Sequence, residues 1–139
     1  MEWEGFEITR ENDSFLIEDN GFSVGVNFKQ DSDIKLLSSS KISSGEVIVG
    51  KEGLNPPGDF EPLNPGEIVD IFGVMIKGFE GNELSFWFKM GSTSFYYSSR
   101  PGDEKDMKWL ESKVDVAFLK ADENSILEAV KIKPRMVVP

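Results

Sequence analysis

Two apolar runs meet at the dipeptide Asn20-Gly21. Asn-Gly is the strongest two-residue signal for a β-hairpin, because both of its residues tolerate a positive φ angle. A two-residue loop at this point predicts the cross-strand pairs Asp19 with Phe22, Ile17 with Val24 and Phe15 with Val26. This register places the apolar side chains of both strands on one face, so we expect an antiparallel hairpin.

A three-stranded meander is predicted between residues 69 and 98. Its strands are the runs Val69–Lys77, Leu84–Lys89 and Ser94–Ser98, which the turns Gly81-Asn82 and Gly91-Ser92 separate. Two tight turns predict a definite register: Phe88 faces Met75 and Phe95, Phe79 faces Leu84, and Phe86 faces Tyr97. On the opposite face of the sheet the same register lines up Ile76, Trp87 and Tyr96. Both faces are apolar, so the sheet is either covered on both sides or uses one aromatic face to meet a partner.

One short helix is expected near residues 104–113. Asp103 can cap its N-terminus, and Met107, Leu110 and Val114 recur at helical spacing. The chain then alternates between apolar and polar residues from Val114 to Phe118, as a strand does.

The stretch from Ile126 to Lys133 fits both the helical and the strand period. We expect a strand, because residues 130–133 alternate and Pro134 disfavours a helical end. The basic cluster Lys131, Lys133 and Arg135 is then interpreted as a solvated strand edge.

Together these elements predict a mainly β fold, an antiparallel two-sheet sandwich or a partly open barrel, with one short helix. The 139 residues fit a single domain spanning 1–139. Residues 50–66 contain four prolines and four glycines, which is typical of an irregular connection.

The chain contains neither histidine nor cysteine. Nucleophile pairs that need an imidazole or a thiol, histidine-ligated metals, zinc–thiolate sites and iron–sulfur clusters are therefore excluded. Catalysis would have to depend on carboxylates, lysine, tyrosine, serine or a metal held by oxygen atoms. We accordingly expect no cofactor and no metal site, and favour a protein that is not an enzyme.

The formal net charge is −10, and residues 1–20 hold seven acids against one arginine. Such a field disfavours nucleic acid and anionic membranes and attracts basic proteins. The first residues are acidic, whereas a secretory signal is basic and then apolar, so a cytoplasmic protein is expected.

Three short motifs carry little weight. Residues 45–51 match the start of a phosphate-binding loop, but Glu52 stands where a hydroxyl should hold magnesium and a strand pattern replaces the flexible loop. Ser38–Lys41 fits Ser-x-x-Lys, without the further elements that this chemistry needs. Close carboxylate pairs, such as Asp31 with Asp33, lack the spacing of a calcium loop.

The leading hypothesis is an acidic inhibitor or immunity-type protein that neutralises a basic protein partner such as a nuclease toxin. Its partner-binding residues are predicted to be Trp87, Tyr96 and Ile76 as apolar anchors, with the acids Glu2, Glu4, Glu7, Glu11 and Asp13. Large aromatic residues more commonly fill a core.

Two alternatives stay open. One is a β module that binds a carbohydrate or another small ligand. The other is an enzyme that works through carboxylates or lysine, which requires a concave site where two such groups converge.

Overall fold

The computed structural model describes residues 1–28, 32–37, 47–50, 59–79, 85–98, 103–119 and 123–138, and at 47–50 and 59–62 it describes the backbone alone. The serine-rich stretch at 38–44, most of the motif at 45–51 and the Gly81-Asn82 turn lie outside these residues. The chain divides into two compact units, Met1–Leu63 and Asn64–Pro139, and each is described by itself. The single domain over 1–139 stays a prediction.

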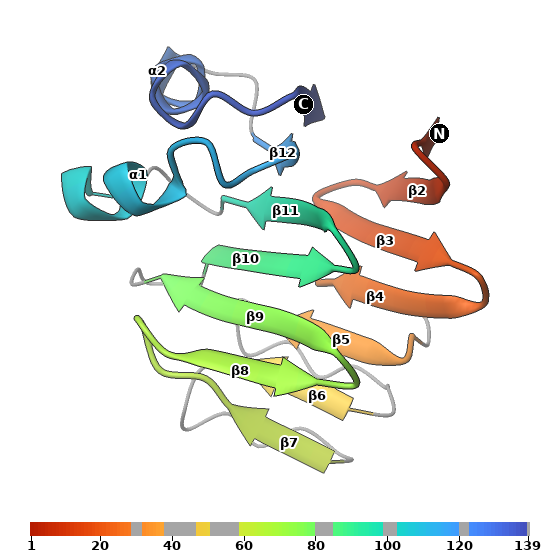
Figure 1. The fold of residues 1–139 in the computed structure, drawn as a ribbon. Coiled ribbons are helices and arrows are strands. Elements are labelled where there is room, and N and C mark those ends of the chain that lie inside the picture. The colour runs from red at the N-terminus through yellow and green to blue at the C-terminus, as the bar shows by residue number, and fades with distance from the viewer. Residues whose placement is uncertain are drawn as a thin grey trace. The chain divides into compact units, whose positions relative to one another are not determined.

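The first unit is a seven-stranded sheet in sequential order (Figure 1). Its strands are β1 (Glu2–Trp3), β2 (Phe6–Glu11), β3 (Ser14–Asp19), β4 (Phe22–Val26), β5 (Ile34–Leu37), β6 (Val47–Gly50) and β7 (Asp59–Pro62). Strands β1 to β4 pair antiparallel, and β4 to β7 pair parallel.

The predicted hairpin is confirmed in the register of β3 and β4. Asp19 pairs with Phe22, Ile17 with Val24 and Phe15 with Val26. Asn20 and Gly21 both have a positive φ, of 48° and 81°. The pairing continues across four strands as a buried row of Ile8, Ile17, Val24 and Ile34.

The second unit is a six-stranded sheet in the order β13-β12-β11-β10-β9-β8. Its strands are β8 (Ile68–Ile71), β9 (Val74–Phe79), β10 (Ser85–Met90), β11 (Thr93–Tyr97), β12 (Val116–Phe118) and β13 (Met136–Val138). Helix α1 (Glu104–Leu110) joins β11 to β12, and α2 (Glu123–Ile132) joins β12 to β13. These two connections let β11, β12 and β13 pair parallel.

The described chain is therefore mainly β, with two mixed sheets and two helices. The expectation of purely antiparallel sheets was wrong, because hairpin signals reveal only neighbours joined by tight turns. Neither α1 nor α2, the helices in the described part of the chain, is long and apolar enough to span a membrane.

The register of the meander is confirmed on one side and shifted on the other. Phe88 faces Phe95 as predicted, and Phe86 faces Tyr97. Between β9 and β10, however, Phe88 faces Ile76 and Trp87 faces Lys77, one residue away from the prediction. Ile76 therefore shares its face with Phe88 and not with Trp87.

The run predicted as one strand from Val69 to Lys77 is interrupted by a turn at Phe72-Gly73. Both residues have a positive φ, of 52° and 83°. The Asp70 Oδ1 atom accepts a hydrogen bond from the Gly73 amide at 3.0 Å. This turn separates β8 from β9 and pairs them antiparallel.

Helix α1 confirms its predicted start but ends earlier, at Leu110. Asp103 caps it, and the Asp103 Oδ1 atom accepts the Asp106 amide at 2.8 Å. The predicted strand over residues 126–133 is wrong, because these residues belong to α2 and to its C-terminal end.

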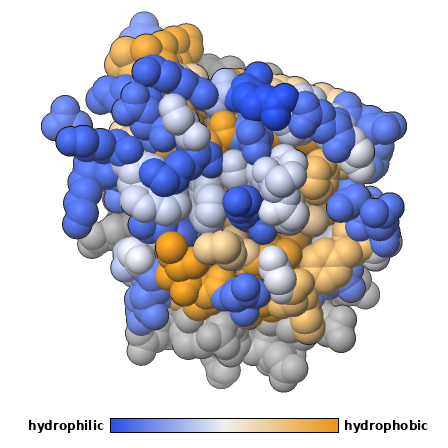
Figure 2. Space-filling model, viewed as in Figure 1, coloured by the Kyte–Doolittle hydropathy of each residue, from blue (hydrophilic) through white to orange (hydrophobic). Residues whose placement is uncertain are grey.

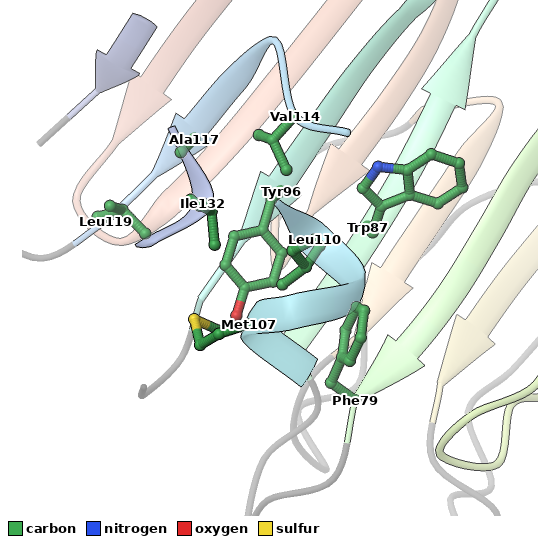
Figure 3. Packing of buried hydrophobic residues seen from close by; sticks show 9 residues of the cluster. All are labelled: Phe79, Trp87, Tyr96, Met107, Leu110, Val114, Ala117, Leu119 and Ile132. Carbon is green, nitrogen blue, oxygen red and sulfur yellow. The ribbon is translucent and has the colours of Figure 1, made fainter. Parts of the chain in front are cut away.

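Both helices pack on the β9–β12 region of the sheet through one apolar cluster (Figure 3). The described residues of the cluster are Phe79, Trp87, Tyr96, Met107, Leu110, Val114, Ala117, Leu119 and Ile132. The Trp87 and Tyr96 rings come from neighbouring positions on β10 and β11. Burial of side chains of this size stabilises the folded state by about 1.5–3 kcal/mol each, so this cluster holds the helices in place.

Candidate functional site

The predicted aromatic anchors lie in the core of the second unit. Trp87 is 6% exposed and Tyr96 is fully buried. The Trp87 indole Nε1 donates to the Lys113 carbonyl oxygen at 2.9 Å. Ile76 is also fully buried, on the other face of the sheet. These three side chains fill the core, as large apolar residues usually do.

The predicted acidic residues belong to the first unit. Glu2, Glu4, Glu7, Glu11 and Asp13 are all exposed. Glu7 forms an ion pair of 3.3 Å with the amino group of Met1. Exposed pairs of this kind contribute little to stability. The role of these acids in binding a partner stays a prediction.

A buried polar contact joins the sheet to helix α2. The Tyr96 hydroxyl donates to Glu128 Oε2 at 3.4 Å, and both side chains are buried. Burial raises the pKa of Tyr96 above its ordinary value, and the Glu128 carboxylate raises it further, whereas hydrogen bonds with Ser98 and Ser85 lower it. Tyr96 therefore stays neutral in the folded protein at physiological pH.

Charged side chains also surround Trp109 on helix α1. The Lys77 ammonium group lies 3.9 Å from the centre of the Trp109 ring, and that of Lys113 lies 5.0 Å from it. Burial lowers the pKa of Lys77, the Asp106 charge raises it, and the charges of Lys105 and Lys113 lower it. This arrangement is a cation–π contact that fixes the Trp109 ring against β9.

Asp106 faces the same cluster from the first turn of α1. Burial raises the pKa of its carboxyl, the neighbouring Asp103 raises it further, and the Lys77 charge lowers it. The charges of Lys77 and Asp106 thus act on each other near the Trp109 ring.

A groove of about 760 Å³ lies between α1 and α2 in the described part of the second unit. Most of the residues that line it are of charged types. Its lining residues are Glu104, Lys105, Met107, Lys108, Glu111, Val130, Lys131 and Lys133. Four lysines against two glutamates make the groove locally positive, although the chain as a whole has a net charge of −10.

An ion pair crosses the groove. Lys133 Nζ donates to Glu111 Oε1 at 3.1 Å. Glu104 lies two helical turns before Glu111, so the two carboxylates share one side of α1. Glu111 and Lys133 thus meet at a concave surface, and the enzyme alternative requires a concave site where two such groups converge.

The sequence did not predict this groove, because residues 126–133 were expected to form a strand. In that interpretation Lys131 and Lys133 formed an exposed strand edge. The signal that could have located the groove is Pro134, which commonly follows the end of a helix. A helix ending just before Pro134 would have placed both lysines at its C-terminus, where cations are favourable.

No family model and no curated protein matches this chain. Solved structures do match. Igni18, a metallo hydrolase from Ignicoccus hospitalis, is 14% identical with a TM-score of 0.75, and the match covers 96% of this chain and 81% of that one.

Two further structures match in the same way. YhfI from Bacillus subtilis, a metallo-β-lactamase fold protein, is 9% identical with a TM-score of 0.63, over 91% of this chain and 78% of that one. A diphosphatase from the PhnP family is 13% identical with a TM-score of 0.64, over 89% and 70% of the two chains. The likeness is one of fold. The structural neighbours include proteins of the metallo-β-lactamase fold, which has an αββα architecture.

This likeness corrects the functional expectation. Proteins with this architecture include hydrolases, whereas the sequence favoured a non-enzymatic inhibitor or immunity-type protein that binds a basic partner. That hypothesis was wrong, and so was the expectation that the chain is not an enzyme. Charge and missing residue types describe a surface and a set of excluded mechanisms, and neither property identifies a fold.

The metal that such hydrolases imply does not fit the residues of this chain. Zinc sites use histidine, cysteine and carboxylate ligands, and catalytic sites are rich in histidine. This chain has no histidine or cysteine. Within the described ranges, no group of three or more aspartates and glutamates gathers closely enough to hold a metal ion.

Proposed function

We propose that this chain is a hydrolase that works through carboxylate and lysine side chains instead of a histidine-bound metal. The likeness in fold to solved hydrolases is the observation that carries this proposal. The complete absence of histidine directs it away from the metal chemistry that those names imply.

The lysines that line the groove between α1 and α2 favour an anionic substrate, and the substrate class we propose is a phosphate ester. Four lysines and two glutamates are among the residues that line the groove. Ammonium groups bind phosphate oxygens through charge-assisted hydrogen bonds. One of the structural neighbours is a diphosphatase, and a diphosphate, like a phosphate ester, is a phosphoryl anion.

Glu111 is the proposed general base. It lies on the groove wall, where its Oε1 atom accepts a hydrogen bond from Lys133 Nζ at 3.1 Å. In the proposed step a water oxygen bonds to phosphorus while Glu111 takes one of the water's protons. The bond from phosphorus to the leaving oxygen breaks, and a lysine ammonium group protonates that oxygen. Lys105 and Lys108 stabilise the charge that develops on the phosphoryl oxygens.

The test is a hydrolysis assay of the purified protein with p-nitrophenyl phosphate and bis-p-nitrophenyl phosphate, with and without a chelator. We expect turnover that survives the chelator. Glu111→Gln should lower kcat/KM by about 100-fold, the lower end of what a general base contributes. Lys108→Gln should mainly raise KM, because it removes a charge that binds the anion.

Glu18→Gln is the matched control. Glu18 is an exposed acid on β3 in the first unit, so its loss should leave kcat/KM unchanged. Full activity of Glu111→Gln would refute the role of the groove. Absence of turnover, or turnover that the chelator abolishes, would refute the proposal as a whole.

A further inference from the structure

Helix α2 presents its large aliphatic side chains to solvent. Ile126, Leu127 and Val130 are 64%, 60% and 67% exposed. Its buried side carries Ser125 and Glu128 together with Ile132. In Figure 2 an orange patch lies over α2 at the top of the molecule. A surface helix normally buries its large apolar side chains, so these three exposed residues mark a surface suited to contact with another molecule.

The exposed residues form one continuous stripe. Glu123, Ile126, Leu127 and Val130 follow the spacing i, i+3, i+4 and i+7, which places them on one helical face. Such a stripe is suited to packing against a second helix with the same pattern. We call these four residues, with Lys131 beside them, the α2 stripe.

The charges at the two ends of the α2 stripe favour a second copy of the stripe in the antiparallel direction. The stripe begins with an acid, Glu123, and ends beside a base, Lys131. When two copies of the stripe pack antiparallel about a twofold axis, Glu123 of each copy lies next to Lys131 of the other. Parallel packing would instead bring like charges together. The stripe is therefore complementary to itself in the antiparallel direction.

We propose that the α2 stripe is the centre of a symmetric homodimer interface. An anionic membrane is a poorer occupant, because the stripe contains a glutamate and the chain carries a net charge of −10. Three aliphatic side chains cover much less than the roughly 800 Å² per partner of a standard interface. The proposed dimer is accordingly weak.

The test is sedimentation equilibrium of the full chain from low micromolar to near-millimolar concentration. We expect a monomer–dimer equilibrium. Ile126→Glu should weaken it at least about tenfold, because the substitution places a charge at the centre of the interface. The control is Ile68→Glu on β8, which puts the same charge on another exposed isoleucine and should leave association unchanged. Circular dichroism of both variants verifies that they fold.

A charge exchange tests the antiparallel direction. Glu123→Lys and Lys131→Glu should each weaken the dimer, and the double variant should recover it, since each lysine again meets a glutamate of the other copy. A chain that is monomeric throughout would overturn the proposal, as would a dimer that is insensitive to Ile126→Glu. A monomer that floats with anionic vesicles, and loses this binding in Ile126→Glu, would show that a membrane covers the stripe.

Discussion

The buried Tyr96 hydroxyl joins the sheet to helix α2 and makes the stability of the fold depend on pH. Its ring belongs to the apolar cluster and meets Phe79 edge-on at 5.9 Å, while its hydroxyl contacts Glu128. Burial raises its pKa, and the Glu128 charge does so further. An unfolded tyrosine ionises near pH 10, so the two states differ above that pH.

Alkaline conditions should therefore weaken the fold through Tyr96. Below about pH 10 the residue is neutral in both states and its contribution to stability is complete. As pH rises further the unfolded chain loses a proton that the folded chain keeps, so the free energy of unfolding falls by up to about 1.4 kcal/mol per pH unit. Urea unfolding at several pH values measures this slope.

The variant Tyr96→Phe should lose stability at neutral pH but show a shallower slope above pH 10 than the wild type. Tyr97 is present in both proteins, so the difference between the two slopes reports on Tyr96 alone. An equal slope in the two proteins would contradict the assignment of this pH dependence to Tyr96.

At the scale of elements, the turn between β8 and β9 carries strain. Phe72 has a φ of 52°, in the left-handed region that bulky residues rarely adopt. Asn and Gly dominate turns in which both central residues have a positive φ. Phe72 is also 60% exposed, so its ring gains little from burial.

Replacing Phe72 by Asn should stabilise the protein by about 0.5–1 kcal/mol, because Asn adopts this backbone conformation with less strain. Phe72→Ala is the control, since it removes the ring and keeps an unfavourable residue in the turn. Thermal and urea unfolding of the three proteins give the comparison. A loss of stability in Phe72→Asn as large as in Phe72→Ala would show that the ring matters more than the backbone.

The same elements show what the sequence could and could not predict. Asn20-Gly21 specified its hairpin because the local turn chemistry decides that conformation. Phe72-Gly73 was missed because Phe is unusual at its position, although Asp70 and Gly73 were available as signals.

Helix α2 was mistaken for a strand because Pro134 was taken to exclude a helix. Lys133 adopts a φ of 54°, and its amide bonds to the Ala129 carbonyl oxygen at 2.9 Å. The helix thus ends in a left-handed residue just before the proline, which is a common C-terminal cap. The groove depends on α2, so it could not be predicted without this helix.

At the scale of the whole molecule, the parallel strand pairs were out of reach of turn signals. Strands β5, β6 and β7 are four residues each and pair across longer connections. Their partners depend on contacts between distant segments, which a pattern of local turns does not encode. The function was harder still to predict from the sequence, because a fold of this kind supports several chemistries and the residues of the site determine which one operates.

The single domain that the sequence predicts has a consequence for unfolding. The two units contain about 60 and 75 residues, and a domain of about 60 residues buries only about 60% of its surface and is marginal alone. We therefore expect both units to unfold in one cooperative transition. Native-state hydrogen exchange can measure this, with the amides of Ile17 on β3 and Phe88 on β10 as reporters, since both residues are fully buried.

If the units depend on each other, the slowest amides of both sheets exchange only through global unfolding. Their opening free energies should then agree with each other and with the value from urea unfolding within about 1 kcal/mol. A larger difference would mean that one sheet opens while the other stays folded, and the chain would then consist of two domains. The comparison uses the unmodified protein, so no substitution can alter the result through a local effect on either unit.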